Sequence, residues 1–147
     1  MDDHRDTDAE GPGGSISAIP PDVCLTLLTG GVVGRVAFIG ADGRQELMPV
    51  NFTVVDEAVY FRTNPTGPLS RLVDGMDNVA FGVDGFDTST GQGWNVTARG
   101  EAKRVIESDV VRAAVASGLR QPWTGGDRDQ VVRIAIREIN GRRVSRT

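Results

Sequence analysis

The sequence is poor in the side chains that carry most enzyme chemistry. Cys24 is the only cysteine and His4 the only histidine, which excludes an intramolecular disulfide, a Cys/His zinc site and a catalytic triad built on a core histidine. Lysine occurs once, at Lys103, so a bound anion must be held mainly by arginine, whose planar guanidinium is permanently charged. Because these cysteine and histidine sites are missing, most hydrolytic mechanisms are excluded.

Long apolar runs are also missing. The most apolar uncharged stretch, residues 23–34, is too short and too rich in glycine to cross a bilayer, which needs about 20 apolar residues. No positively charged start followed by an apolar run marks a secretory signal. We therefore expect a cytoplasmic protein with no membrane partner.

The negative charge is concentrated at one end of the chain. The formal charge is −4, and residues 1–14, with their excess of acidic side chains, carry all of it. This segment lacks apolar periodicity and is predicted to be a disordered acidic leader, followed by a single neutral domain over residues 15–147. The arginines near the C-terminus lie beside Glu138 and are typical of a solvated strand end, so no nucleic acid is expected as a partner.

Periodicity divides the domain into short helices and six strands. Apolar residues at helical spacing before Gly30 and Gly31 predict a helix over residues 17–28, and similar patterns predict helices over 68–73 and 109–119. The predicted strands are residues 34–40, 44–55, 58–63, 78–84, 93–106 and 130–139, with a loop at 85–92, a bend or bulge at Gly100 and a turn at Asn140-Gly141. This pattern indicates a mainly β fold, a small antiparallel barrel with peripheral helices.

The strongest candidate for an anion-binding site is the segment in which the third predicted strand is followed by a short helix. Arg62 can hold two phosphate oxygens in a fork, and the hydroxyls of Thr63, Thr66 and Ser70 can donate hydrogen bonds. Arg71 adds a second positive charge, and the amides at the helix start attract an anion. The alternative is an ordinary strand-end arginine followed by a threonine that only caps the helix.

A proline inside a strand marks a second candidate. Pro49 has no backbone donor and implies an edge strand or a bulge, which leaves neighbouring backbone groups free for a ligand. With Val50, Asn51 and Phe52 it forms a segment that suits a flat heterocyclic cofactor, whose polar edge needs backbone donors and acceptors. The alternative is a purely structural strand.

Two tryptophans complete the candidate residues. Trp94 begins the longest predicted strand, and Trp123 lies between Pro122 and a pair of glycines. Large aromatic side chains are mostly structural, but the exposed context of Trp123 calls for a ligand or a second subunit to cover it. No GxGxxG or GxxxxGKS motif is present, which excludes the classical dinucleotide and nucleoside triphosphate sites.

The order of motifs resembles that of the pyridoxamine 5′-phosphate oxidase-like family of flavin-binding split β-barrels. The motifs are CLTLL, VGRVAF, PVNF, VYFRT, VAFGVD, GWNVTARGEA, PW and RIAI, and they span roughly residues 18–145. The resemblance implies a six-stranded antiparallel split β-barrel that forms a homodimer and binds FMN in two equivalent sites at the dimer interface.

Individual roles follow from the same resemblance. Val50, Asn51 and Phe52 would line the isoalloxazine edge, and Arg62 and Thr63 would hold the phosphate. The implied activity is that of an FMN-dependent oxidoreductase, which passes a hydride through flavin N5 to or from a small organic substrate and needs no side-chain acid or base.

The sequence departs from the family pattern at three points. Pro68 stands where family members commonly have a lysine, Gly82 where they have an acidic residue, and the only histidine is in the leader, so oxidation of pyridoxamine phosphate itself is not expected. Two alternatives stay open. One is a reductase that uses the deazaflavin F420, with its anionic tail on Arg71 and the C-terminal arginines. The other is a non-catalytic dimeric module that binds a flavin or another ligand.

Overall fold

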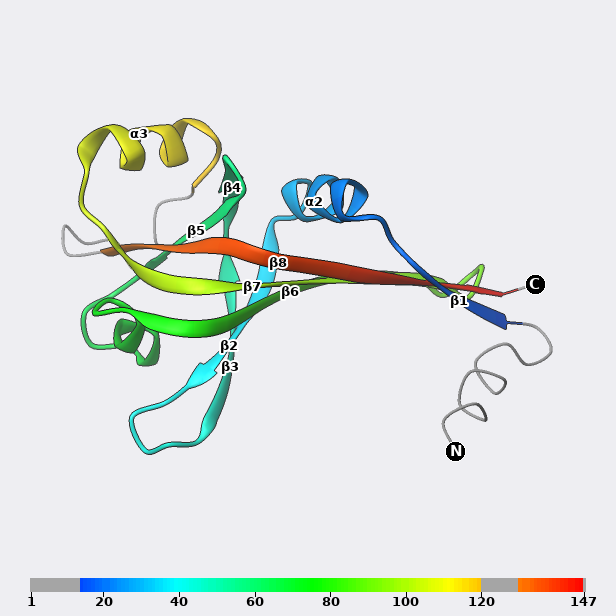
Figure 1. Cartoon of the computed structure of the whole chain (residues 1–147), viewed down its shortest axis with the longest axis horizontal. Coiled ribbons are helices and arrows are strands. Elements are labelled where there is room, and N and C mark those ends of the chain that lie inside the picture. The colour runs from blue at the N-terminus through cyan, green and yellow to red at the C-terminus, as the bar shows by residue number, and fades with distance from the viewer. Residues whose placement is uncertain (1–13, 120–129, 147) are drawn as a thin grey trace.

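The computed structural model describes residues 14–119 and 130–146 and shows one curled antiparallel sheet with three short helices (Figure 1). The strands are β1 (Gly14–Ala18), β2 (Val33–Ile39), β3 (Gln45–Asn51), β4 (Thr53–Val55), β5 (Ala58–Thr63), β6 (Met76–Asp87), β7 (Gln92–Val105) and β8 (Gln130–Arg146). The helices are α2 (Pro21–Thr29), the 3₁₀ helix η1 (Pro68–Leu72) and α3 (Ser108–Ala116). The predicted mainly β class is confirmed, and none of the described helices is long and apolar enough to span a membrane.

The sheet runs in the order β3-β2-β6-β7-β8-β5-β4, with β1 paired to the C-terminal half of β8. The segment that forms β3 and β4 changes partners at Phe52. Before that residue β3 pairs with β2, and after it β4 pairs with β5. The barrel is therefore split between β3 and β5, and the predicted strand 44–55 is two strands rather than one.

Alternation along the strands builds two cores. One face of β2, β6, β7 and β8 buries the main core around Phe61, Phe81 and Leu28, and α2 closes it with Cys24 and Leu28 one turn apart. The opposite face of β5 and β8 forms a smaller core with Ala114 of α3. The Thr53 hydroxyl donates to the Ser117 backbone oxygen and also forms a hydrogen bond with the Ser117 hydroxyl, and these contacts fix the end of α3 against β4.

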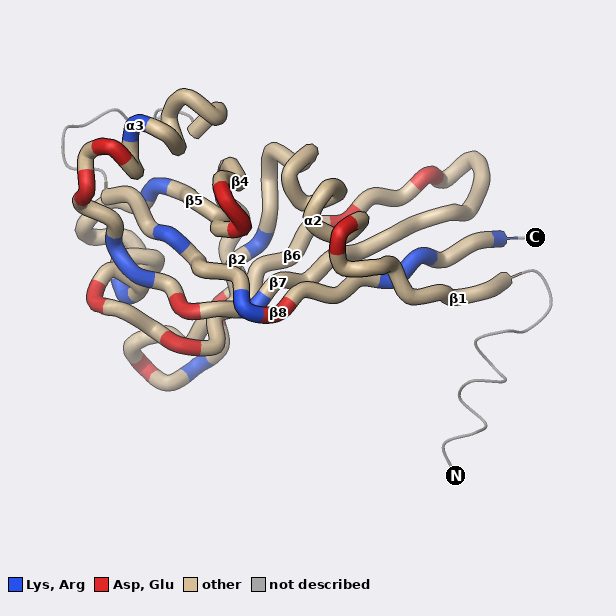
Figure 2. The backbone as a smooth tube through the Cα atoms, turned by 45° about the horizontal axis from the view of Figure 1, so that its top comes forward, with Lys and Arg blue, Asp and Glu red and all other residues tan. Residues whose placement is uncertain are grey.

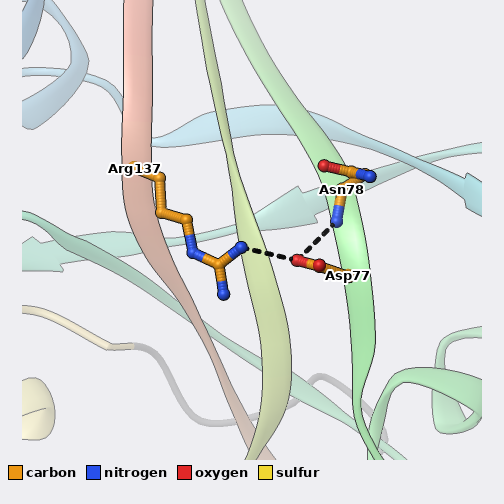
Figure 3. A network of polar contacts seen from close by, with 3 residues as sticks. All are labelled: Asp77, Asn78 and Arg137. Carbon is orange, nitrogen blue, oxygen red and sulfur yellow. Dashed lines mark hydrogen bonds and ion pairs between the residues drawn. The ribbon is translucent and has the colours of Figure 1, made fainter.

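Two bulges face each other across β7 and bend the sheet. The register of β6 shifts at Asp77 and Asn78, and β8 has one extra residue, Arg137, opposite the junction of Arg99 and Gly100 in β7. Arg137 Nη1 donates to Asp77 Oδ1 at 2.9 Å, and the same oxygen accepts the Asn78 amide at 3.1 Å (Figure 3). The ion pair thus joins the two bulges.

Gly100 is required at this bend. A Cβ atom at this position would lie 1.7 Å from the backbone oxygen of Ala135, a distance that no side chain could tolerate. The irregularity predicted at Gly100 is confirmed as a register shift between Arg99 and Gly100, with the extra residue in β8.

Beyond the bend the long strands continue into a projecting arm (Figure 1). We define the arm as residues 14–18, 84–94 and 140–146, and the barrel as the rest of the described residues. One row across the arm joins Phe86, Gly93, Val144 and Ile16 through consecutive strand pairings. Phe86 is 70% exposed, and Val144 and Ile16 are exposed as well, so this row presents apolar side chains to solvent. Charged residues of both signs are interspersed over the described chain, whereas β1 has none (Figure 2).

Several predicted boundaries were wrong, and the count of six strands becomes eight. The first helix begins at Pro21, not at residue 17, because residues 14–18 pair with β8. Proline in the first helical turn costs no hydrogen bond, so Pro21 marks the true start. Half of the predicted loop at 85–92 is strand, since residues 85–87 belong to β6 and residue 92 to β7, and the predicted turn at Asn140-Gly141 is part of β8. Gly14, assigned to the leader, begins β1, and residues 1–13 lie outside the described part of the chain.

Candidate functional site

The junction between β5 and η1 is organised by Asn64. Its Oδ1 accepts hydrogen bonds from the Thr66 amide at 3.0 Å, the Thr66 hydroxyl at 3.0 Å and the Gly67 amide at 2.9 Å. Gly67 is the N-cap residue of η1, without a side-chain cap. The prediction that Thr66 caps this helix was wrong, because the Asn64 carboxamide already takes the amides that precede the helix. These amides are therefore occupied within the loop, which removes part of the anion-binding argument.

Two side chains of the predicted phosphate site have structural contacts of their own. Arg71 Nε donates to the backbone oxygen of Ile39 at 2.8 Å and holds η1 against the end of β2. Because Arg71 is exposed and guanidinium has five N–H donors, most of them remain for an anion. Thr63 is buried, and its hydroxyl donates to the Asn64 carbonyl at 3.2 Å, so its proton is already used.

Arg62 and Thr63 lie on opposite faces of β5, as consecutive strand residues must. Thr63 shares its face with Phe61 in the main core, and half-buried Arg62 shares its face with Tyr60 in the smaller core. Both can approach one phosphate only at the end of the strand. Ser70 is half-buried, and its hydroxyl has no hydrogen-bond partner among residues 14–119 and 130–146.

Pro49 lies on an edge strand, as predicted, because β3 ends the sheet. Pro49 itself is exposed, whereas Val50 and Phe52 are buried. The Phe52 ring packs edge-to-face on Phe81, with centroids 4.7 Å apart, and its amide donates to Val32. The ring thus belongs to the core, and half-buried Asn51 is the polar side chain of this segment that remains accessible.

The two predicted motifs meet at the split of the barrel. The pairing of β4 with β5 places Thr53 opposite Tyr60, and Asn51 and Arg62 each lie two residues away from this pair along the sequence. β3 and β5 are in contact. The two motifs, separate in sequence, therefore lie on or directly after strands that contact each other.

Trp94 does not join this group within one chain. Arg62 pairs with Val131 and Trp94 with Arg143, twelve residues farther along β8, which is about 40 Å of extended strand. Half-buried Trp94 instead lies against Gly85, where a Cβ atom would come within 2.7 Å of its Nε1. Trp123 lies outside the described residues.

The sequence analysis missed a shallow hollow of about 260 Å³ on the outer face of β2, β3, β6 and β7. Arg35 and Asp84 form an ion pair of 3.5 Å across it, and Leu47 at its edge is 64% exposed. Its floor contains Ala80 and Gly82. In the sequence, small residues at every second strand position could have pointed to this hollow. Alternation alone, however, does not distinguish a face exposed to solvent from an interface.

The described residues give little support for a metal site or a reactive thiol. No group of three or more metal-ligating side chains lies together among the described residues, and Asp87 is engaged by Ser89 in the hairpin turn. Cys24 is fully buried, its thiol donates to the Ile19 carbonyl at 3.4 Å, and burial followed by the nearby Asp22 charge raises its pKa. The thiol thus behaves as a small buried apolar group.

Comparisons with known proteins agree with this architecture. A family model described as pyridoxamine 5′-phosphate oxidase matches residues 20–143. The FAD binding protein from Mycobacterium smegmatis is 30% identical, with 86% of this chain and 98% of that chain covered and a TM-score of 0.72. A conserved protein of unknown function from Corynebacterium diphtheriae is 31% identical, with coverages of 90% and 98% and a TM-score of 0.70.

A more distant structure shows the fold alone. The FAD and heme binding protein from Mycobacterium smegmatis is 15% identical, covers 90% of this chain and 73% of its own, and has a TM-score of 0.63. No curated protein matched. With most of its length matched by the family model and two relatives at 30% identity or more, the chain belongs to the pyridoxamine 5′-phosphate oxidase-like family of split β-barrels.

Proposed function

We propose that the protein is a flavin-dependent oxidoreductase that binds FMN at the split of the barrel. The observation that carries this proposal is that β3 and β5, the strands of the two motifs, are in contact, so that residues 49–52 and 62–71 bring arginine, hydroxyl and amide side chains to the same part of the barrel. Relatives described as FAD-binding proteins support a flavin. FMN and FAD share the isoalloxazine ring and the first phosphate.

Different residues at the split would bind the phosphate and the flat ring of a flavin. Arg62 and Arg71 supply positive charge and the Ser70 hydroxyl supplies a hydrogen-bond donor. The half-buried Asn51 side chain offers a donor and an acceptor for a polar ring edge. A bound flavin would supply hydride transfer to or from a small organic substrate. The polypeptide binds and orients the cofactor and needs no acidic or basic side chain for the chemistry.

We further propose a homodimer with the cofactor between protomers. The outer sheet face with Leu47 and the apolar row with Phe86 are exposed in one chain, and large exposed apolar surfaces mark interaction sites. A partner copy is also the means by which Trp94 could approach a split that lies about 40 Å away along its own β8.

The alternative cofactor F420 is less well served by one chain. Its long anionic tail was assigned to Arg71 and the C-terminal arginines, but Arg142, Arg143 and Arg146 lie in the arm, at the far end of β8 from Arg62. A non-catalytic flavin-binding module would share the same site and differ only in the absence of turnover.

Cofactor titration tests the proposal. We expect the purified chain to bind FMN or FAD more tightly than F420, measured by equilibrium dialysis and by the visible flavin bands. Arg62→Ala should weaken flavin binding roughly 10- to 100-fold, the loss of one charged hydrogen bond. Arg44→Ala, which removes an exposed arginine from the β2–β3 turn, is the matched control and should bind normally.

Two outcomes would overturn the flavin assignment. One is a chain that binds none of the three cofactors, and the other is an Arg62→Ala variant with unchanged affinity. Reduction of the bound flavin by NADH or NADPH, followed by reoxidation by a small acceptor, separates the oxidoreductase from the non-catalytic module.

A further inference from the structure

A cavity of about 670 Å³ lies between α3 and the sheet, and none of the residues that line it is assigned to the cofactor. Its walls come from β5, β8, the first two turns of α3 and the turn between β4 and β5. A volume of this size is within the range of small-molecule binding sites. The polar side chains that line it are Tyr60, Arg133, Asp56, Glu57 and Asp109.

Tyr60 is the best evidence that the cavity is built for a ligand. Its side chain is 95% buried, because the residue is only 5% exposed, and it lines the cavity. Its hydroxyl has no hydrogen-bond partner in the described part of the chain. Buried tyrosine hydroxyls nearly always have such a partner, and leaving one unpaired costs about 1 to 3 kcal/mol.

Arg133 also lines the cavity and also lacks a polar partner among the described residues. It pairs directly with Tyr60 in the register of β5 and β8, so both side chains lie on the face under α3. The guanidinium is half-buried, and within residues 14–119 and 130–146 it makes no ion pair or hydrogen bond. A phenol and a guanidinium side by side form a donor pair that suits a carboxylate.

Negatively charged side chains line the same cavity as Arg133. Asp56 and Glu57 form the tight turn between β4 and β5 with positive φ values of 49° and 60°, and Asp109 lies in the first turn of α3. In the described residues none of these carboxylates pairs with Arg133. The cavity therefore holds positive and negative groups apart, an arrangement that one molecule carrying both charges would bridge.

We propose that this cavity binds a small zwitterion with a carboxylate and an ammonium group. The carboxylate is held by Arg133 and the Tyr60 hydroxyl, and the ammonium by the carboxylates of Asp56, Glu57 and Asp109. The apolar side chains between them contact the carbon chain of the ligand. The site does not depend on the flavin assignment, because none of these residues belongs to the cofactor site.

The only tyrosine of the chain provides the assay. Full-length protein labelled with 3-fluorotyrosine has one protein ¹⁹F resonance, from Tyr60. We expect γ-aminobutyrate to shift it saturably, and butylamine and butyrate, which carry one of the two charges each, to bind at least about tenfold more weakly, the difference that one charged contact makes.

Variants assign the two ends of the ligand. Arg133→Ala should weaken γ-aminobutyrate binding at least about tenfold, and Asp56→Asn combined with Asp109→Asn, at exposed positions that do not endanger folding, should do the same. Arg142→Ala removes an arginine from the other end of β8 and should leave binding unchanged. The proposal is overturned if γ-aminobutyrate does not shift the resonance, if butylamine or butyrate binds equally well, or if the double variant keeps its affinity.

Discussion

The barrel and the arm are built from the same three long strands but differ in what covers them. In the barrel, β6, β7 and β8 bury one face in the main core, and the smaller core under α3 covers part of the other. In the arm, Phe86 of β6, Val144 of β8 and Ile16 of the short strand β1 are exposed. One chain alone buries the apolar faces of the barrel. The apolar row of the arm, in contrast, stays exposed until something packs against it.

The paired bulges at Arg137 and Asp77 and the close contact at Gly100 lie within the barrel, because Val79, Phe81 and Ala98 of the main core lie between them and the arm. This comparison shows that the long strands extend past the core that one chain provides. The predictions below test first the bulge at Gly100, then the barrel and the arm, and finally the tip of the arm.

The largest effect is expected from Gly100→Val. The added Cβ would overlap the Ala135 carbonyl oxygen at 1.7 Å, and backbone cannot yield as a flexible side chain can. We expect a loss of about 3 kcal/mol or more in the free energy of unfolding, measured by urea denaturation. Gly82→Ala is the control, since its Cβ would have its nearest neighbour at 3.8 Å. Equal stabilities of the two variants would contradict the account of the bend.

Two phenylalanines on β6 compare the regions directly. Phe81 is fully buried in the barrel and Phe86 is 70% exposed in the arm. Phe81→Ala should cost about 3 to 5 kcal/mol of unfolding free energy, and Phe86→Ala less than about 0.5 kcal/mol per chain. If the arm docks on a second copy, Phe86→Ala should raise the dimer dissociation constant about tenfold in analytical ultracentrifugation. An unchanged constant would separate the arm from the dimer interface.

The smallest effect is expected at the tip of the arm. Hydrogen bonds from the Ser89 side chain and amide hold the pKa of Asp87 below its ordinary value of 3.8. A depressed folded pKa means that the turn is stabilised at pH values above 3.8, and that this support is lost as the pH falls through the lower, folded value. NMR titration of the Asp87 carboxyl should show the depression, and Ser89→Ala should reduce it. Titration of the wild-type carboxyl at its ordinary value would contradict this.

The sequence predicted the mainly β class and most strand positions, because alternation is a local signal. It missed β1, since Gly14–Ala18 has too few apolar residues to alternate and is a strand only through its pairing with Arg142–Arg146. It also ended the last strand at residue 139, because Asn140-Gly141 is a typical turn dipeptide. In the structure Gly141 is required for another reason, since a Cβ there would lie 2.6 Å from the Asn95 carbonyl oxygen and 2.9 Å from Cys24 Sγ.

The cofactor roles of residues 49–52 and 62–71 stay predictions. The strands that carry the two motifs are in contact, but the sequence could not show that Phe52 packs on Phe81 or that Asn64 takes the loop amides. Those outcomes depend on tertiary contacts. The cavity under α3 was missed for the same reason, because Tyr60 and Arg133 are far apart in sequence and become neighbours only through the register of β5 and β8.

The position of β8 also sets an order for folding. This strand follows the other described strands in the sequence, yet it lies between β7 and β5 and brings Val132 and Ile134 into the main core. Until it docks, β7 and β5 expose unpaired backbone edges, and such edges recruit other chains. The barrel should therefore fold slowly, as expected when most strand pairing is non-local, and nascent or truncated chains that lack residues 130–146 should be the species that aggregate.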